Sequence, residues 1–289
     1  MKNQCILCQS SDTSVLFKRD AYAMVRCKKC GLIYRLPQVE KDQHLREIQK
    51  HYSEVDPSYQ VAYSRKKLYE RFLSKIERIK RKHSRLLDVG CGIGYFLSLA
   101  RKYGYDAYGL ELIPELVEVG VRNYGLAIQC AEFEEANFSE NYFDVITLWN
   151  VFEELSHSKE SILKIKRILK PEGLLFIRTP NARFHLLVYR IHQMLKKLHL
   201  EHILPYQSFL FHIFNFSKKS LEWELRTHNF SHIKIKNSRP TSEDPYAVGK
   251  AVGILKIFAF LIAQFLFFLT WGRLTVAPSI EVFAENEKA

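Results

Sequence analysis

Apolar and polar positions alternate in blocks along most of the chain, and these blocks predict strands separated by helices. Apolar runs predict seven strands, at residues 85–89, 106–111, 126–130, 143–149, 173–179, 231–236 and 279–285, with helices between the first five. A further helix is predicted before the first strand, where Leu68, Phe72, Leu73, Ile76 and Ile79 recur at helical spacing. This order of elements predicts an α/β fold built on an open sheet.

A glycine-rich turn follows the first predicted strand. Asp88 precedes a turn that contains Gly90, Gly92 and Gly94. Glycine lacks a Cβ atom and lets the backbone approach a ligand closely. Glu111 ends the second predicted strand, seventeen residues after Gly94. A glycine turn with an acid about 20 residues later is typical of a bound nucleoside whose ribose hydroxyls meet a carboxylate.

This turn resembles motif I of the class I S-adenosylmethionine (SAM) methyltransferases, in the form LLDVGCGxG. Two later segments continue the resemblance. Residues 141–151 look like the fourth strand of that family, and residues 168–177 look like its Leu-Lys-Pro-Gly-Gly turn and fifth strand. The resemblance covers about residues 84–181 and is to methyltransferases of type 11 or 23. It implies a Rossmann-like sheet of seven strands.

The resemblance also implies where SAM would bind. Asp88 and the glycine turn would line its methionine part, and Glu111 would accept both ribose hydroxyls with its two oxygens. Glu132 would receive the adenine amino group, with apolar residues on both faces of the ring, and the end of the fourth strand would border the sulfonium. The expected cofactor-binding residues are Asp88, Gly90, Cys91, Gly92, Gly94, Glu111, Leu112, Glu132, Phe133, Trp149 and Asn150.

Two Cys-x-x-Cys pairs near the amino terminus predict a metal site. Cys5 and Cys8 form the first pair, and Cys27 and Cys30 form the second. Zn²⁺ takes four thiolates in a tetrahedron, and each pair supplies two of them from a tight turn. Four protein ligands leave no open position, so we expect a structural zinc ribbon. A ribbon at this place resembles those of some bacterial methyltransferases that act on sugars or cell-envelope glycans.

Candidate catalytic residues follow the fourth predicted strand. Related enzymes, including the ubiquinone-type O-methyltransferases, often carry Glu-His there, whereas this chain has Glu153 and Glu154. The change removes the expected histidine base. Glu153 is a candidate base or acceptor-orienting residue, and His157 is a candidate substitute, against the simpler interpretation of a surface histidine. The missing histidine also keeps open a non-catalytic SAM-binding scaffold.

Basic and apolar segments predict contact with a membrane. Lys and Arg number 43 against 31 Asp and Glu, and the net charge of +12 favours an anionic partner. In 184–198 an apolar stripe is surrounded by Lys and Arg, which is typical of an interfacial helix or of a lid packed on the catalytic domain. Residues 251–272 are almost continuously apolar and long enough to span a bilayer, but they lie between two strands of one expected sheet. We therefore interpret them as a membrane-dipping segment, with a core or dimer helix as the alternative.

The predicted organisation is a zinc ribbon at 1–36, a linker and helix at 37–83, and a methyltransferase domain at 84–289. Within that domain, 183–217 forms the lid or interfacial helix and 251–272 forms the hydrophobic insertion.

The expected function is SAM-dependent methyl transfer to a lipid, a lipid-linked sugar or another small envelope precursor, with the accepting atom and the oligomeric state left open. Because no apolar leader follows Met1, we expect a cytoplasmic protein, peripheral or monotopic on the inner face of an anionic membrane. A nucleic-acid methyltransferase is the rival hypothesis, with the zinc ribbon and the basic helix at the phosphate backbone. The lack of a base-flipping motif of the Asn/Asp-Pro-Pro-Tyr type argues against it.

Overall fold

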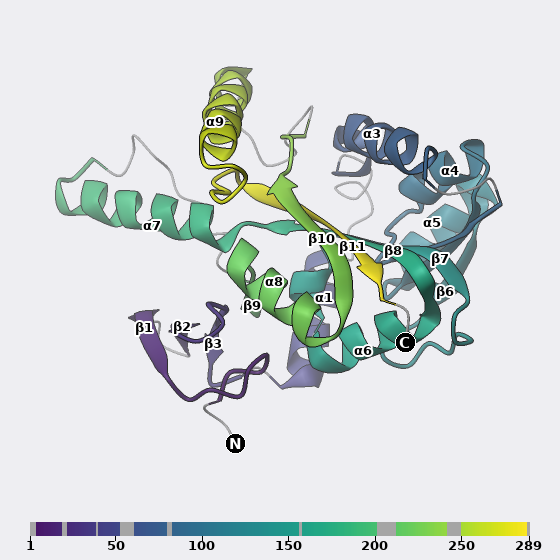
Figure 1. Cartoon of the computed structure of the whole chain (residues 1–289), viewed down its shortest axis with the longest axis horizontal. Helices are drawn as coiled ribbons and strands as arrows, with labels where there is room; N and C mark the ends of the chain where they lie inside the picture. The colour runs from purple at the N-terminus through teal and green to yellow at the C-terminus, as the bar shows by residue number, and fades with distance from the viewer. Residues whose placement is uncertain are drawn as a thin grey trace.

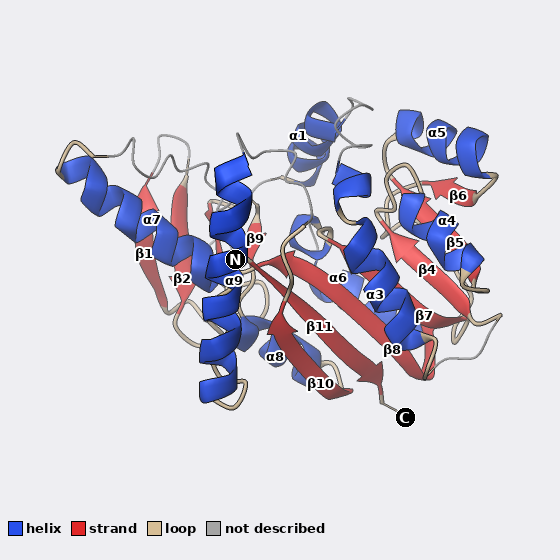
Figure 2. Ribbon diagram, turned by 90° about the horizontal axis from the view of Figure 1, so that it is seen from above, coloured by secondary structure: helices blue, strands red, loops and turns tan. Residues whose placement is uncertain are grey.

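The computed structural model describes residues 4–18, 22–38, 40–52, 61–79, 83–155, 158–200, 212–241 and 250–287. It contains a seven-stranded sheet flanked by helices and, at the lower left of Figure 1, a small four-stranded sheet that includes the amino-terminal strands. Figure 2 shows the large sheet from above, with helices in front of it and behind it. The predicted α/β class is confirmed.

The large sheet has the strand order β10-β11-β8-β7-β4-β5-β6. Strands β4 to β8 pair in parallel, whereas β11 runs antiparallel to both β8 and β10. The seven strands are β4 (Arg85–Val89), β5 (Asp106–Glu111), β6 (Ala127–Cys130), β7 (Phe143–Trp149), β8 (Leu169–Pro180), β10 (Phe230–Asn237) and β11 (Ser279–Asn286). Six of them begin and end within one residue of the prediction.

β8 begins four residues earlier than expected. Phe143 of β7 pairs with Leu169, but Val145 pairs with Leu174, so four residues of β8 bulge out between the two pairings. Asp144 lies opposite this bulge, where its carboxylate accepts from Arg85 N (2.9 Å) and from Lys170 Nζ (2.8 Å). Asp144 of β7 therefore links β4 and β8 near the amino ends of these parallel strands, at the edge opposite their carboxyl ends.

Helices cover both faces of the large sheet because successive strand residues point to opposite sides. On one face, Leu86 packs in a cluster with α3 (Lys66–Ile76) and α4 (Tyr95–Lys102). On the other, Leu87 packs in a cluster with α6 (Ser158–Ile168) and α8 (Lys218–Thr227). α5 (Pro114–Tyr124) lies beside α4 (Figures 1 and 2). The predicted helix before the first strand is therefore α3, although Ile79 lies beyond its end and is exposed.

Residues 131–142 form turns instead of the helix expected between the third and fourth strands. Lys164 of α6 accounts for part of this difference. Its Nζ donates to the carbonyls of Phe133, Glu134 (3.0 Å) and Ala136. Backbone carbonyls that accept from a side-chain donor do not need helical N–H partners. The loop after β6 is therefore stable without forming a helix.

The amino-terminal strands form a sheet with a strand from the carboxyl-terminal half of the chain. β1 (Thr13–Lys18), β2 (Ala23–Cys27) and β3 (Ile33–Leu36) form an antiparallel meander, and β9 (Phe214–Asn215) pairs with β3. α1 (Lys41–Tyr52) follows this sheet in the chain. These amino-terminal strands, called the ribbon below, are therefore joined by backbone pairing to the carboxyl-terminal half of the chain.

α7 (Ala182–Lys197) packs on the ribbon. Ala182 and Leu186 are buried with Met24 and Ile33, and the rings of Phe17 and Tyr189 have centroids 4.8 Å apart. The predicted 183–217 element divides into this helix, residues 201–211, which lie outside the described residues, and β9.

α9 (Lys250–Leu269) connects β10 to β11, as the position of the apolar segment predicted. It is attached to the sheet on one side, where Asn237 Nδ2 donates to Ala263 O at 2.9 Å and Phe260 is buried. Many of its apolar side chains are exposed, so α9 is not a core helix within this chain. None of the helices formed by described residues is both long enough and apolar enough to cross a membrane.

Candidate functional site

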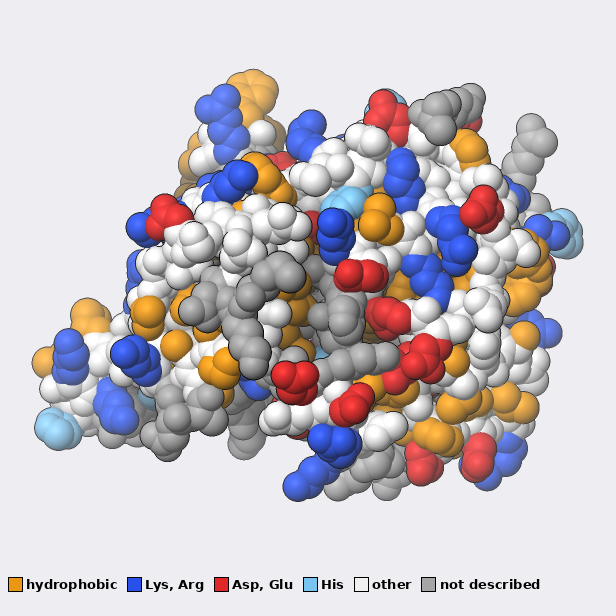
Figure 3. Space-filling model, turned by 90° about the horizontal axis from the view of Figure 1, so that it is seen from below, with side chains coloured by type: hydrophobic (Ala, Val, Ile, Leu, Met, Phe, Trp, Pro, Cys, Tyr) orange, Lys and Arg blue, Asp and Glu red, His pale blue; other side chains and the backbone are white. Residues whose placement is uncertain are grey.

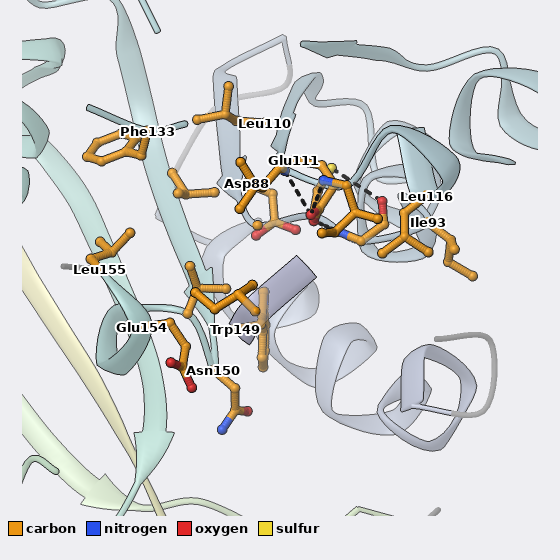
Figure 4. Close-up of a pocket in the computed structure, with 18 of the residues that line it drawn as sticks. Asp88, Ile93, Leu110, Glu111, Leu116, Phe133, Trp149, Asn150, Glu154 and Leu155 are labelled. Carbon is orange, nitrogen blue, oxygen red and sulfur yellow. Dashed lines mark hydrogen bonds between the residues drawn. The ribbon is translucent and has the colours of Figure 1, made fainter. Parts of the chain in front are cut away.

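A cavity of about 560 Å³ lies at the carboxyl ends of β4, β5 and β7. The turn after β4, the end of β5, the loop after β6 and the end of β7 form its walls (Figure 4). Residues of α1 and of the segment 61–69 complete it. Open α/β sheets bind ligands at this edge, and the volume lies within the range of small-molecule sites.

The cavity brings together the residues that were expected to bind SAM, with one exception. The lining includes Asp88, Gly90, Cys91, Gly92, Glu111, Leu112, Glu132, Phe133, Trp149 and Asn150. Gly94 is not part of the lining. It precedes α4 with a φ of +73°, and a Cβ atom there would lie 2.4 Å from Leu126 Cδ1, so this glycine serves the packing of the turn.

Glu111 ends β5 and is almost fully buried. Its Oε2 accepts from Gly92 N (2.7 Å), and its Oε1 accepts from Leu112 N (2.8 Å) and Ile113 N (3.1 Å). Burial raises the pKa of this carboxyl, although the three backbone donors act in the opposite direction. The side chain therefore holds the glycine turn against the next loop, a role that the sequence did not predict. Since a carboxylate has about four acceptor positions, it still has capacity for a ligand hydroxyl.

Asp88 is the penultimate residue of β4, and its side chain is buried, with the residue 2 % exposed. Its Oδ1 accepts from Thr147 Oγ1 at 2.6 Å, across the pairing of β4 with β7. Burial raises the pKa of Asp88 to about 8. A cationic group in the cavity would therefore find a carboxyl that ionises readily in its presence.

Gly90 and Gly92, the two glycines at the cavity, have different roles. A Cβ atom on Gly90 would lie 2.4 Å from Val151 Cγ2, so this position must be glycine for the turn to pack. A Cβ atom on Gly92 would meet no atom within 4 Å, and φ is +55°. Gly92 lines the cavity, and the space beside it is available for a ligand. The turn thus allows a ligand to approach the backbone closely at Gly92.

The end of β7 places Trp149 in an aromatic cluster. Its ring lies 4.7 Å from that of Tyr69 and 4.5 Å from that of Phe176, between centroids. Asn150 then turns the chain with a φ of +61°, which asparagine tolerates better than most residues. The short 3-10 helix η1 (Phe152–Glu154) follows this turn.

The structure separates the two adjacent glutamates of η1. Glu153 is buried, accepts from Asn150 Nδ2 at 3.3 Å and does not line the cavity, whereas Glu154 does. His157 lies outside the described residues. Two other histidines contact Glu154: His212 Nδ1 is hydrogen-bonded to Oε1, and His44 Nε2 lies 3.5 Å from Oε2. Sequence reasoning missed both, because they are 58 and 110 residues from Glu154 and carry no local motif.

The four amino-terminal cysteines lie together, with all four sulfur atoms within 4.8 Å of one another. Cys5 Sγ is 3.5 Å from Cys30 Sγ, and Cys8 Sγ is 3.4 Å from Cys27 Sγ. These separations exceed a disulfide bond and approach the spacing of roughly 3.8 Å that a tetrahedral Zn–S distance of 2.3 Å gives. The donor set and its geometry therefore fit a Zn²⁺ ion with four thiolate ligands.

Comparison with known proteins shows the family to which this chain belongs. A sequence profile described as "Methyltransferase domain" matches residues 61–235, more than half of the chain. The chain belongs to the methyltransferase domain family. It has the α/β fold and the cysteine cluster that the sequence predicted.

Curated relatives of this methyltransferase match it over part of their length. The ubiquinone biosynthesis O-methyltransferase of Coxiella burnetii is 28 % identical over 120 residues, which are 40 % of this chain and 51 % of that protein. The enzyme of the same name from Actinobacillus pleuropneumoniae is 31 % identical over 107 residues, 34 % of this chain and 46 % of that protein. The chain thus spans about half the length of the curated relatives it matches.

Solved structures share the fold at low sequence identity. A SAM-dependent methyltransferase from Thermotoga maritima has a TM-score of 0.55 and 14 % identity, and the match covers 84 % of this chain and 100 % of that one. A chain from the complex of the Haloferax volcanii Trm112 methyltransferase activator with a methyltransferase has a TM-score of 0.58 and 14 % identity, over 85 % and 98 % of the two chains. These likenesses support the fold alone.

Removing the carboxylate of Glu111 should weaken SAM binding. Glu111→Ala loses an acceptor for ribose hydroxyls and also frees Gly92 N, so the loss should be at least about 1.5–3 kcal/mol, the value of a hydrogen bond to a charged group. Glu111→Gln keeps one acceptor oxygen and should lose less. Isothermal titration calorimetry with SAM measures both, with exposed Glu118→Ala as the control. Equal affinities of wild type and Glu111→Ala would contradict the assignment.

The cysteine cluster should hold about one Zn²⁺ per chain. Cys27→Ser should lose the metal and disorder the ribbon while SAM binding persists, because Cys27 lies outside the cavity lining. Elemental analysis and calorimetry on the purified variant check this. Cys130→Ser, which changes an exposed cysteine away from the cluster, is the control. Full zinc retention by Cys27→Ser would show that the ligands are wrong.

Proposed function

We propose that this methyltransferase transfers the methyl group of SAM to a hydroxyl of a lipid, a lipid-linked sugar or a related envelope precursor at the cytoplasmic face of a membrane. The observation that carries the proposal is the exposed apolar surface of α9 on an enzyme with a small-molecule cavity. The relatives named ubiquinone biosynthesis O-methyltransferase support oxygen as the accepting atom.

In this proposal the cavity residues divide the work of holding SAM. Asp88 and the glycine turn face the methionine part, Glu111 accepts from the ribose, and Glu132 and Phe133 meet the adenine. SAM supplies a methyl group that is already activated by its sulfonium. The protein therefore contributes mainly by positioning the two reactants and excluding water, with Trp149 and Asn150 at the border between donor and acceptor.

The surface of α9 would be costly to leave in water. Phe265 and Phe268 of α9 are 62 % and 82 % exposed, Trp271 in the turn just after α9 is 94 % exposed, and Phe258 and Leu261 of α9 are exposed as well. Burying one large apolar side chain is worth about 1.5–3 kcal/mol, and soluble monomers rarely expose large contiguous apolar patches. Because α9 connects two neighbouring strands of one sheet, it can enter a membrane interface only from one side.

α7 provides the positive charge that such a surface needs near anionic lipid. Arg190, Lys196 and Lys197 are exposed beside exposed Met194 and Leu198. At the left edge of Figure 3, where α7 projects in Figure 1, apolar and basic side chains stand next to one another. α7 and α9 both lie at the end of the molecule opposite α4, α5 and β6 (Figures 1 and 2). Apolar insertion with flanking Lys and Arg is typical of interfacial helices.

Labelled methyl transfer tests the function. Zinc-containing protein incubated with methyl-labelled SAM and total extract of the source cells should place the label in the lipid or lipid-linked sugar fraction. Base-stable label in that fraction excludes a methyl ester, and mass spectrometry of the labelled product should then show a methyl ether on a former hydroxyl. Label in RNA or DNA would support the nucleic-acid alternative, and binding of SAM without any transfer would support a scaffold; either result contradicts the proposal.

Membrane docking should depend on the burial of the apolar side chains of α9 in the membrane. Wild type should co-sediment with anionic liposomes and resist release by salt, since salt screens charges and not apolar burial. Phe265→Glu with Phe268→Glu should abolish co-sedimentation and leave SAM affinity unchanged. Val121→Glu with Leu163→Glu is the matched control, because it replaces two exposed apolar residues on α5 and α6. Wild type that stays in the supernatant would remove the main support for a lipid acceptor.

A further inference from the structure

A carboxylate at the edge of the cavity is held from behind by two histidines. Glu154 lines the cavity, next to Asn150 and Trp149 (Figure 4). His212 Nδ1 donates to Oε1 of Glu154, while His44 Nε2 donates to the backbone carbonyl of Glu154 at 2.9 Å and lies 3.5 Å from Oε2. His44 is buried and His212 is largely buried, and neither lines the cavity. They can therefore act on a ligand only through Glu154.

Both histidines are placed by the zinc ribbon. His44 lies in α1, which directly follows the ribbon strands in the chain. His212 precedes β9 by two residues, and β9 is the strand that pairs with β3 of the ribbon. The ring of Phe216, just after β9, packs on that of Phe152 in η1 with centroids 4.9 Å apart. The ribbon, β9 and the turn that carries Glu154 thus form one packed unit.

We propose that Glu154 takes the proton of the methyl acceptor, and that His44 and His212, held by the zinc ribbon, are positioning residues for its carboxylate. This inference rests on the proposed methyl transfer to a hydroxyl. Glu153, the residue of this pair that the sequence favoured, is buried behind Asn150 and does not reach the cavity lining. The structure therefore favours Glu154 over Glu153 as the candidate base.

The charges around Glu154, His44 and His212 favour the ionised form of Glu154. Burial is the largest single influence on the pKa of Glu154 and would raise it, but the hydrogen bond from His212 and the charges of His212, His44 and Arg35 together lower it. Burial would likewise lower the pKa of His212, but the bond to Glu154 raises it. The other charged or titratable groups near the pair are Glu153, His44, Arg35 of β3 and His185 of α7. Glu154 and His212 thus each stabilise the charged form of the other.

The proposed step balances without a further reactant. The acceptor oxygen forms a bond to the methyl carbon, and the bond from that carbon to sulfur breaks with its electron pair left on sulfur. The O–H bond of the acceptor breaks, and its proton passes to the carboxylate of Glu154. Because the hydroxyl becomes strongly acidic as the methyl bond forms, an ionised carboxylate is a sufficient base in the transition state.

Isosteric variants test the step. With label incorporated into the lipid extract as the readout, Glu154→Gln should lower kcat by about 10²–10⁴-fold, the range of general base catalysis, with SAM affinity unchanged by calorimetry. His212→Gln and His44→Gln should lower kcat less and move the acidic limb of the pH profile to higher pH. The shift follows because Glu154 loses the partners that keep it ionised. His232→Gln, an exposed histidine on β10, is the control.

A spectroscopic measurement separates positioning from general folding effects. In the NMR titration of ring-labelled histidines, the pKa of His212 should fall in Glu154→Gln. It should also fall in zinc-free Cys27→Ser, if the ribbon holds the pair together.

Different results would contradict the role of Glu154 and its histidines, the role of the ribbon, and the proposed function. Full turnover by Glu154→Gln, or a wild-type pH profile for His212→Gln, would overturn the role of the cluster. An unchanged His212 titration in zinc-free protein would overturn the role of the ribbon. If wild type binds no SAM or labels no acceptor, the proposed function fails instead.

Discussion

Three backbone N–H groups converge on the buried carboxylate of Glu111, and the shape of the cavity depends on this contact. One donor belongs to Gly92 in the turn after β4, and two belong to the loop after β5. Parallel pairing of β4 with β5 brings these ends side by side. Hydrogen bonds to a charged acceptor are among the stronger ones in proteins, so one side chain fixes two loops that line the cavity.

The zinc ribbon is structurally part of the methyltransferase domain. β9 lies in the ribbon sheet but belongs to the carboxyl-terminal half of the chain, and α7 packs its buried residues on the ribbon. A Zn²⁺ ion held by the four cysteines would have a structural role in this arrangement. Four thiolate ligands cannot open a coordination position for chemistry, but they can make a small sheet rigid enough to hold His44 and His212 against Glu154.

Most of the sheet could be predicted from sequence because its strands are short apolar runs bounded by turn residues. The place of the cavity could be predicted as well, since its residues lie at the ends of neighbouring parallel strands and such ends meet at one edge. Where strand ends alone fix the position of a residue, as for Asp88 and Glu111, local sequence is sufficient.

The rest depended on contacts between distant segments. No local pattern indicates that Lys164 would satisfy the carbonyls of the loop after β6, or that β9 would join the ribbon. Glu154 lines the cavity and Glu153 does not, and both follow the left-handed turn at Asn150 in the short helix η1. A pattern of adjacent acids cannot show which of them faces a ligand.

The central claim is that this methyltransferase holds SAM in the cavity at the carboxyl ends of β4, β5 and β7. A crystal structure of the zinc-containing protein with S-adenosylhomocysteine tests it most directly. The account predicts ribose hydroxyls within hydrogen-bonding distance of Glu111 and an adenine ring beside Phe133, with the sulfur on the side of Asn150. A nucleoside bound elsewhere, or one whose ribose makes no contact with Glu111, would contradict the account.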